Sequence, residues 1–264
     1  MMKFAFDLIS DLHIDTWPEP FDWSGRATSQ FCVVAGDVCS DRDLLYRTLH
    51  HLGQCYKAVF YVDGNEEHSQ QINQLGLSYR KLASGVRKIP QVVYLQDNVV
   101  VVDGVAFLGT NGWWAYDFDL GIDAEAAAEW HRDKANLTDF NIHSIRRASN
   151  TDATYMLASV KKLQTHRDVK RIVMVTHTVP RPDLLYHDPM ISDRLVFNMM
   201  GNRFMHSVLE QDTERKIDTW CFGHYHSKID QYHDGVRYVN NCRGRGNTEW
   251  SQHVYHPLRI TVEY

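Results

Sequence analysis

The sequence lacks a basic excess, a long apolar run and any closely spaced pair of cysteines. Its 28 Lys and Arg residues stand against 33 Asp and Glu residues, which gives a formal net charge of −5. Non-specific nucleic-acid binders usually carry surplus positive charge, so a nucleic-acid partner is not favoured. No apolar run is long enough to cross a membrane, and the run before Asp7 is too short for a signal peptide. We therefore expect a cytoplasmic protein without a membrane partner.

The five cysteines are an odd number and show no Cys-x-x-Cys spacing. This pattern argues against a disulfide framework and against a zinc site built from thiolates. Reduced thiols in a cytoplasmic protein are the simpler interpretation of Cys32, Cys39, Cys55, Cys221 and Cys242. Histidine, by contrast, is abundant at 15 residues, which directs attention to metal ligands.

Strand-like and helix-like segments alternate along the 264 residues. Short buried strands are expected at Lys3–Ile9, Phe31–Ala35, Ala58–Val62, Gln91–Tyr94, Arg171–Val175 and Thr219–Phe222. A hairpin around Asp103-Gly104 is expected to join Val99–Val102 to Val105–Leu108, and the C-terminal third predicts further strands. Helical spacing predicts helices at Arg42–Leu52, Ser69–Leu82, Ala124–Ala135, Asp152–Thr165 and Gly201–Gln211. Because no repeat or linker interrupts this order, we expect a single domain over residues 1–264.

Several of these apolar strands end in polar residues of metal-binding type. Five clusters follow one another: Asp11-Leu12-His13, Gly36-Asp37, Gly64-Asn65-Glu66-Glu67, Thr176-His177 and Gly223-His224-Tyr225-His226. Binding sites in α/β proteins gather in loops at the carboxyl ends of strands. Any one of these residues is more often a surface, turn or hydrogen-bonded residue, but the ordered set favours a metal site.

This ordered set resembles the calcineurin-like metallophosphoesterase family, over the span from Asp11 to His226. Members of that family usually show Asp-x-His, Gly-Asp, Gly-Asn-His followed by an acid, a lone His, and Gly-His-x-His. The resemblance implies an α/β sandwich of two mixed β-sheets flanked by helices, with the metal site at the carboxyl-terminal edge of the strands. It also implies an enzyme that hydrolyses phosphate esters.

By the same resemblance, two divalent ions would share the site. One ion would be bound by Asp11, His13, Asp37 and His226, and the other by Asp37, Asn65, His177 and His224. Asp37 would then bridge both ions. Oxygen and nitrogen ligands without sulfur suit Mn, Fe, Zn or Ni better than Ca.

The chemistry explains why these residue types are needed. Phosphate esters resist hydrolysis because their anionic oxygens repel a nucleophile. Two metal ions about 3.5–4 Å apart neutralise those oxygens and supply a hydroxide near neutral pH. Asp11 and His13 alternate on an extended strand end, as do His224 and His226, so each pair addresses the site from one strand.

Glu66 departs from the family pattern, because it stands where a histidine usually contacts the phosphate or protonates the leaving group. An ionised Glu66 would repel a phosphomonoester dianion more than a diester monoanion, which favours phosphodiesters. Two alternatives stay open. Burial would raise the pKa of Glu66 and make it a general acid, or His68 would take that role.

Two further segments carry candidate site residues. Trp113 and Trp114 resemble a segment of some bacterial members of the family, and would either line the substrate pocket or pack in the core. Arg243 would either bind a phosphate oxygen or pair with an acid. His187 is noted because it lies near the loop of a proposed ligand.

The predicted function is hydrolysis of a phosphate ester by metal-bound hydroxide, with phosphodiesters as the first choice. Phosphomonoesters, including phosphoproteins, are the second choice and nucleic acid the third. The predicted catalytic residues are Asp37, Asn65, Glu66 and Arg243. The rival interpretation is a non-catalytic binding module, which should have lost ligands, whereas every ligand position here is filled. No oligomeric state is predicted.

Overall fold

The computed structural model describes residues 2–118, 121, 123–134, 141–186, 193–246, 248 and 254–264. Its first sheet has the spatial order β11 (Leu258–Glu263), β1 (Lys3–Ile9), β2 (Phe31–Ala35), β3 (Ala58–Val62) and β4 (Val92–Tyr94). Its second sheet has the order β5 (Asn98–Val102), β6 (Val105–Thr110), β7 (Arg171–Thr176), β8 (Ile217–Phe222), β10 (Val236–Asn240) and β9 (Ile229–His233).

Both sheets are mixed, as expected. Strands β1 to β4 run parallel, and β11 joins the edge antiparallel to β1. In the second sheet β6, β7, β8 and β10 run parallel, while β5 and β9 are antiparallel to their neighbours. The hairpin at Asp103-Gly104 is confirmed, because Val102 pairs with Val105 and both turn residues have positive φ.

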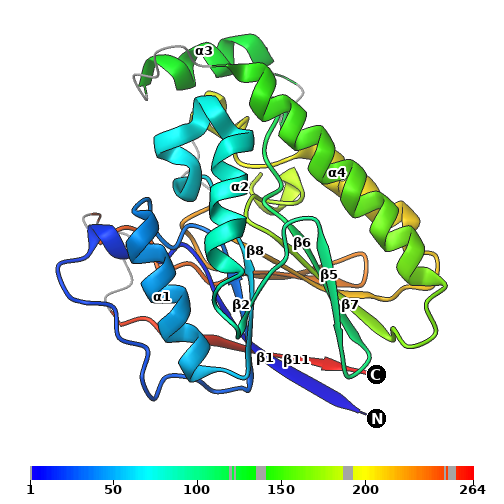
Figure 1. The fold of residues 1–264 in the computed structure, drawn as a ribbon. Helices are drawn as coiled ribbons and strands as arrows, with labels where there is room; N and C mark the ends of the chain where they lie inside the picture. Colours follow the sequence, from blue (N-terminus) through cyan, green and yellow to red (C-terminus); the bar gives the residue numbers. More distant parts are fainter. Residues whose placement is uncertain are drawn as a thin grey trace.

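Helices flank the two sheets on both sides, and one further helix lies beyond the sheets at the top of the view in Figure 1. The α-helices are α1 (Arg42–Cys55), α2 (Leu75–Val86), α3 (Ala124–Lys134), α4 (Ile142–Gln164) and α5 (Arg194–Phe197). The 3₁₀ segments are η1 (Ile14–Thr16), η2 (Glu66–Gln74), η3 (Pro182–Leu184) and η4 (Arg203–Gln211). Among the described residues, no helix has the length and hydropathy that a membrane crossing requires.

Three apolar layers hold the sandwich together. Phe60 and Phe107, one from each sheet, stack between the sheets with ring centroids 4.2 Å apart. Helices α1 and α2 pack on the outer face of the first sheet, and α4 packs with η4 on the second. Because each central strand is covered on both faces, its sequence is a continuous apolar run and not an alternating one. The predicted α/β sandwich is therefore confirmed.

Three predicted helices differ in their detail. The predicted helix Ser69–Leu82 is split into η2 and α2, with a non-helical Gln71 between, because the side chains of Glu67 and His68 are drawn inward to buried partners. Helix α4 begins ten residues earlier than predicted, at Ile142. Asp152, the predicted first residue, lies inside the helix, and its side chain accepts hydrogen bonds from the backbone of Gly112 and Trp113. The segment predicted as a helix at Gly201–Gln211 is the 3₁₀ segment η4. The single-domain organisation stays a prediction.

Candidate metal centre

The parallel strands of both sheets end at one edge, and the predicted ligands follow those ends. The ligands that directly follow β1, β2, β3, β7 and β8 are Asp11, Asp37, Asn65, His177 and His224. Backbone hydrogen bonds connect these loops. Asp11 N donates to Gly36 O at 3.0 Å, and Gly223 N donates to His177 O at 2.8 Å. The candidate metal ligands of the first sheet therefore meet those of the second sheet at this edge.

The first group of side chains is Asp11, His13, Asp37 and His226. Each offers a ligand atom, and these atoms all lie within 4.8 Å of one another. The Nε2 atoms of His13 and His226 face each other at 2.9 Å. Asp37 Oδ2 lies 3.7 Å from His13 Nε2, and Asp11 Oδ1 lies 3.6 Å from His226 Nε2. This is the first set that the sequence predicted.

The second group gathers around the other oxygen of Asp37. Asp37 Oδ1 lies 3.3 Å from His177 Nε2, and His224 belongs to the same cluster within 4.8 Å. Asn65 Oδ1 lies 3.1 Å from His177 Nε2. The two carboxylate oxygens of Asp37 thus face different groups, so this side chain could contact an ion in each group.

Two ring orientations are fixed by backbone carbonyls. His177 Nδ1 lies 2.9 Å from Ala35 O, and His224 Nε2 lies 3.1 Å from Met199 O. A ring nitrogen that donates to a carbonyl leaves the other nitrogen as a lone-pair acceptor. His177 therefore presents Nε2 to the cluster and His224 presents Nδ1. Trp114 stacks on the His224 ring at 5.3 Å, which further fixes that ring.

Burial shapes the charge of the cluster. It lowers the pKa of His13 and His224 to about 3, so both imidazoles are neutral and able to ligate. Burial also favours a neutral His177, but the adjacent Asp37 outweighs it and raises the pKa of His177 to about 10. In the metal-free protein this ring is therefore protonated, and a metal ion would have to displace that proton to bind Nε2. Asp11 Oδ2 is buried with no hydrogen-bond partner among the described residues, and burial raises the Asp11 pKa. A divalent ion would satisfy this acceptor and stabilise both carboxylates, so the donor set fits metal ions.

Glycines before the ligands allow this close approach. Gly36 has φ +83°, and a Cβ there would lie 2.7 Å from Cγ of His177. A Cβ at Gly223 would lie 2.5 Å from Oδ2 of Asp11. Larger residues at these two positions would push candidate ligands apart.

Glu67 is a residue whose role the sequence analysis did not identify. Its buried carboxylate accepts from the backbone N–H groups of Asp37 at 3.2 Å, Val38 at 2.7 Å and Gly64 at 2.7 Å. It thereby fastens the loop after β2 to the loop after β3. The signal was present in the sequence, since Glu67 occupies the acidic position that ends the third motif.

Glu66, at the position of the usual family histidine, forms an ion pair with Arg245. Burial and the negative charge of Asp37 raise the pKa of Glu66, and Arg245 opposes that shift. The backbone N–H of Glu66 donates to Asp37 Oδ1 at 2.9 Å, so this pair lies directly beside the cluster. Sequence reasoning missed Arg245.

His68 cannot act as the general acid in place of Glu66, an alternative that the sequence left open. It is fully buried, with Nε2 2.8 Å from Asp63 Oδ2 and Nδ1 2.8 Å from Ser78 Oγ. Both ring nitrogens therefore have partners inside the protein, which overturns that alternative. Trp113 is likewise buried, and its indole N–H donates to Tyr79. Trp113 and Trp114 belong to the core next to the candidate centre, which favours the packing interpretation.

Arg243 lies against the ring of Trp17. Its guanidinium carbon lies 3.8 Å from the ring centroid of Trp17, and it lines a pocket whose wall includes none of the predicted ligands. In the described part of the chain it has no ion pair with an acid. A contact between Arg243 and substrate at the metals remains a prediction. His187 lies outside the described residues.

The fold agrees with the sandwich that the family resemblance implied, and solved structures share it. No protein-family profile and no curated protein matches the chain. Phosphopantetheinyl hydrolase from Mycobacterium tuberculosis is similar with a TM-score of 0.70 and 17% identity, over 97% of this chain and 95% of that one. A structure described as a 5'-nucleotidase from Staphylococcus aureus has a TM-score of 0.51 and 18% identity, over 99% of this chain and 51% of that one. At these identities the likeness shows the fold alone.

Proposed function

We propose that this protein is a phosphoesterase that uses two divalent metal ions. One observation carries the proposal: the two oxygens of the buried Asp37 face two separate groups of oxygen and nitrogen ligands. The names of the two similar structures, a phosphopantetheinyl hydrolase and a 5'-nucleotidase, support a phosphate-ester substrate. The proposed ligands are Asp11, His13, Asp37, Asn65, His177, His224 and His226, with Mn, Fe, Zn or Ni as the metals.

The residues of the chain would do two kinds of work. The bound metals would supply Lewis acidity and a hydroxide near neutral pH. Asp37 would hold both ions at a fixed separation, and Glu67 keeps Asp37 in place through its backbone N–H. The His177 and His224 rings are held by carbonyls, so their ligating nitrogens are oriented in advance. This fixed framework is what in-line attack on a phosphate ester requires.

Phosphodiesters are the proposed substrates, because the negative charge of Glu66 would repel phosphomonoesters more strongly. A bare Glu66 about 5 Å from a phosphate would repel one extra negative charge by roughly 3 kcal/mol at an effective dielectric near 20. Arg245 is paired with Glu66 and offsets much of this repulsion. We therefore expect a diester preference of about tenfold or less. The ion pair opposes the rise in the Glu66 pKa that burial causes, so we expect Glu66 to be a weaker proton donor than burial alone would make it, and good leaving groups to react best.

The test is hydrolysis of a bis-aryl and a mono-aryl phosphate, side by side, with Mn, Ni, Zn and Mg. Asp37→Asn should lose activity about a hundredfold or more. Asp168→Asn is the matched control, because Asp168 is exposed and lies outside the cluster. A metal-loaded protein that hydrolyses neither ester would contradict the proposal and favour a non-catalytic binding module. Faster cleavage of the mono-aryl ester would instead support the alternative of a phosphomonoesterase or protein phosphatase.

A further inference from the structure

A pocket of about 360 Å³ lies between the segment 17–26 and Arg243, beside the loop that carries Asp11 and His13. Trp17 forms part of its wall, and the Trp17 indole N–H lies 3.1 Å from Leu12 O and 3.2 Å from Gly244 O. The pocket is therefore a neighbour of the candidate metal centre and shares no predicted ligand with it.

Arg243 is the unusual residue in this pocket. Its guanidinium lies over the Trp17 ring, with the carbon 3.8 Å from the ring centroid. Its Nε is buried and has no hydrogen-bond partner in the described part of the chain. Burial also lowers the Arg243 pKa, the direction expected when desolvation disfavours a charged guanidinium. An unpaired buried donor is costly, and a bound anion would remove that cost.

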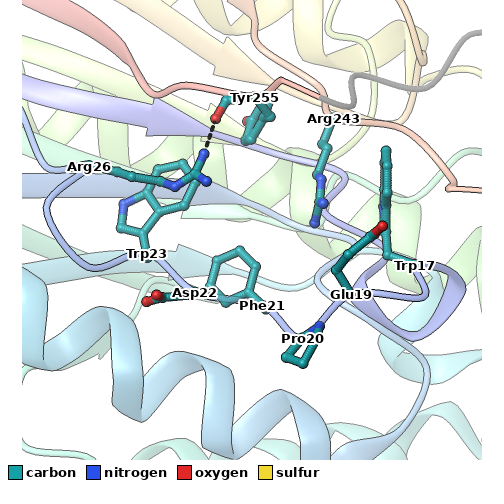
Figure 2. A pocket seen from close by; sticks show the side chains of 9 residues that line it. All are labelled: Trp17, Glu19, Pro20, Phe21, Asp22, Trp23, Arg26, Arg243 and Tyr255. Atoms are coloured by element: carbon teal, nitrogen blue, oxygen red, sulfur yellow. Dashed lines mark hydrogen bonds between the residues drawn. The ribbon is translucent and has the colours of Figure 1, made fainter.

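A second cation and aromatic rings complete the wall. Figure 2 shows Arg243 beside Trp17 at one side of the pocket, and Arg26 beside Trp23 at the other. Arg26 Nη1 donates to Tyr255 O at 2.8 Å, which fixes this guanidinium. Two guanidinium groups thus share a small space with flat apolar faces, an arrangement that suits an anionic group on a planar apolar body.

We propose that this pocket binds a small molecule that carries one carboxylate or phosphate group on an aromatic or similar apolar body. The anionic group would accept hydrogen bonds from Arg243, and the apolar body would lie between the aromatic side chains. Two carboxylates, Glu19 and Asp22, also line the pocket, and Glu19 opposes the effect of burial on the Arg243 pKa. Their negative charge should weaken anion binding. This site goes beyond the proposed phosphoesterase activity and does not depend on metal ions.

The test uses phenylacetate as the probe and isothermal titration calorimetry on the full chain with its metals removed by a chelator. We expect phenylacetate to bind saturably, one molecule per chain. The neutral phenylacetamide should bind about tenfold or more weakly than phenylacetate. Arg243→Gln should weaken phenylacetate binding about tenfold or more, whereas the exposed Arg80→Gln should leave it unchanged. Glu19→Gln should tighten it about twofold or more, a gain that damaged folding cannot produce.

No binding up to about 10 mM phenylacetate would overturn the proposal, as would equal binding of phenylacetamide or of the Arg243→Gln protein. Kinetics with the metal-loaded protein then distinguish two sources of the anion. Competitive inhibition of bis-aryl phosphate hydrolysis would identify the pocket as a subsite for a remote anionic part of the substrate. Binding without competition would identify a separate small molecule. Either result supports the anion site.

Discussion

A methyl group at Gly36 should damage the candidate metal centre through packing alone. Gly36 has φ +83°, and a Cβ there would lie 2.7 Å from Cγ of His177 and 2.9 Å from the backbone nitrogen of Gly64. Gly235 has nearly the same φ, +84°, but a Cβ there would meet nothing within 4 Å. Gly235→Ala is therefore a matched control that carries the backbone cost without the collision.

Gly235→Ala should lower the free energy of unfolding by about 1 kcal/mol, because alanine is strained at positive φ. Gly36→Ala should lower it by about 2–4 kcal/mol, since overpacking adds about 1–3 kcal/mol. It should also displace the His177 ring from Ala35 O, and thereby remove roughly one bound metal ion per chain. Urea denaturation and elemental analysis measure both effects. If Gly36→Ala matches Gly235→Ala in stability and metal content, the inference that a side chain at position 36 collides with His177 is wrong.

Three further predictions concern charge around the cluster. Glu66→Gln should raise the ratio of monoesterase to diesterase activity by about 2–10-fold, and Arg245→Gln should lower this ratio. If both variants shift the ratio in the same direction, repulsion of monoesters by Glu66 is wrong. The folded pKa values of His13 and His224 are about 3, below the unfolded value of 6.5, so the folded state binds fewer protons in that interval. In the metal-free protein both rings should therefore still be neutral at about pH 5, and an NMR titration midpoint near pH 6.5 for either ring would contradict this. Glu67→Gln should cost about 1–3 kcal/mol and weaken binding of both metals, whereas unchanged metal affinity in a chelator competition would limit Glu67 to a structural role.

The strand ends could be predicted from sequence because their signal is local. An apolar run that stops at a polar residue marks both a buried strand and the loop after it, as at Val62 before Asp63-Gly64-Asn65. The family resemblance then supplied the order in which these loops meet. The segment after β3 was less predictable, since tertiary contacts of Glu67 and His68 override its helical spacing.

The two arginines near the end of the chain show where sequence reasoning failed. On an extended strand Arg243 and Arg245 would point to the same side. Gly244 has φ +82°, a left-handed conformation that turns the chain between them. Arg243 therefore packs on Trp17, while Arg245 reaches Glu66, 179 positions away in the sequence. A partner at that separation leaves no local signal.

The most direct test of the central claim is the metal content of the Asp37→Asn protein beside the wild type, after reconstitution with Mn and removal of loosely bound ions. The two oxygens of Asp37 face separate ligand groups, so two ions per wild-type chain are predicted, with lower occupancy of both sites in Asp37→Asn. The exposed Asp168→Asn should keep the wild-type content. Metal content near zero in the wild type, or an unchanged content in Asp37→Asn, would contradict a dinuclear centre bridged by Asp37.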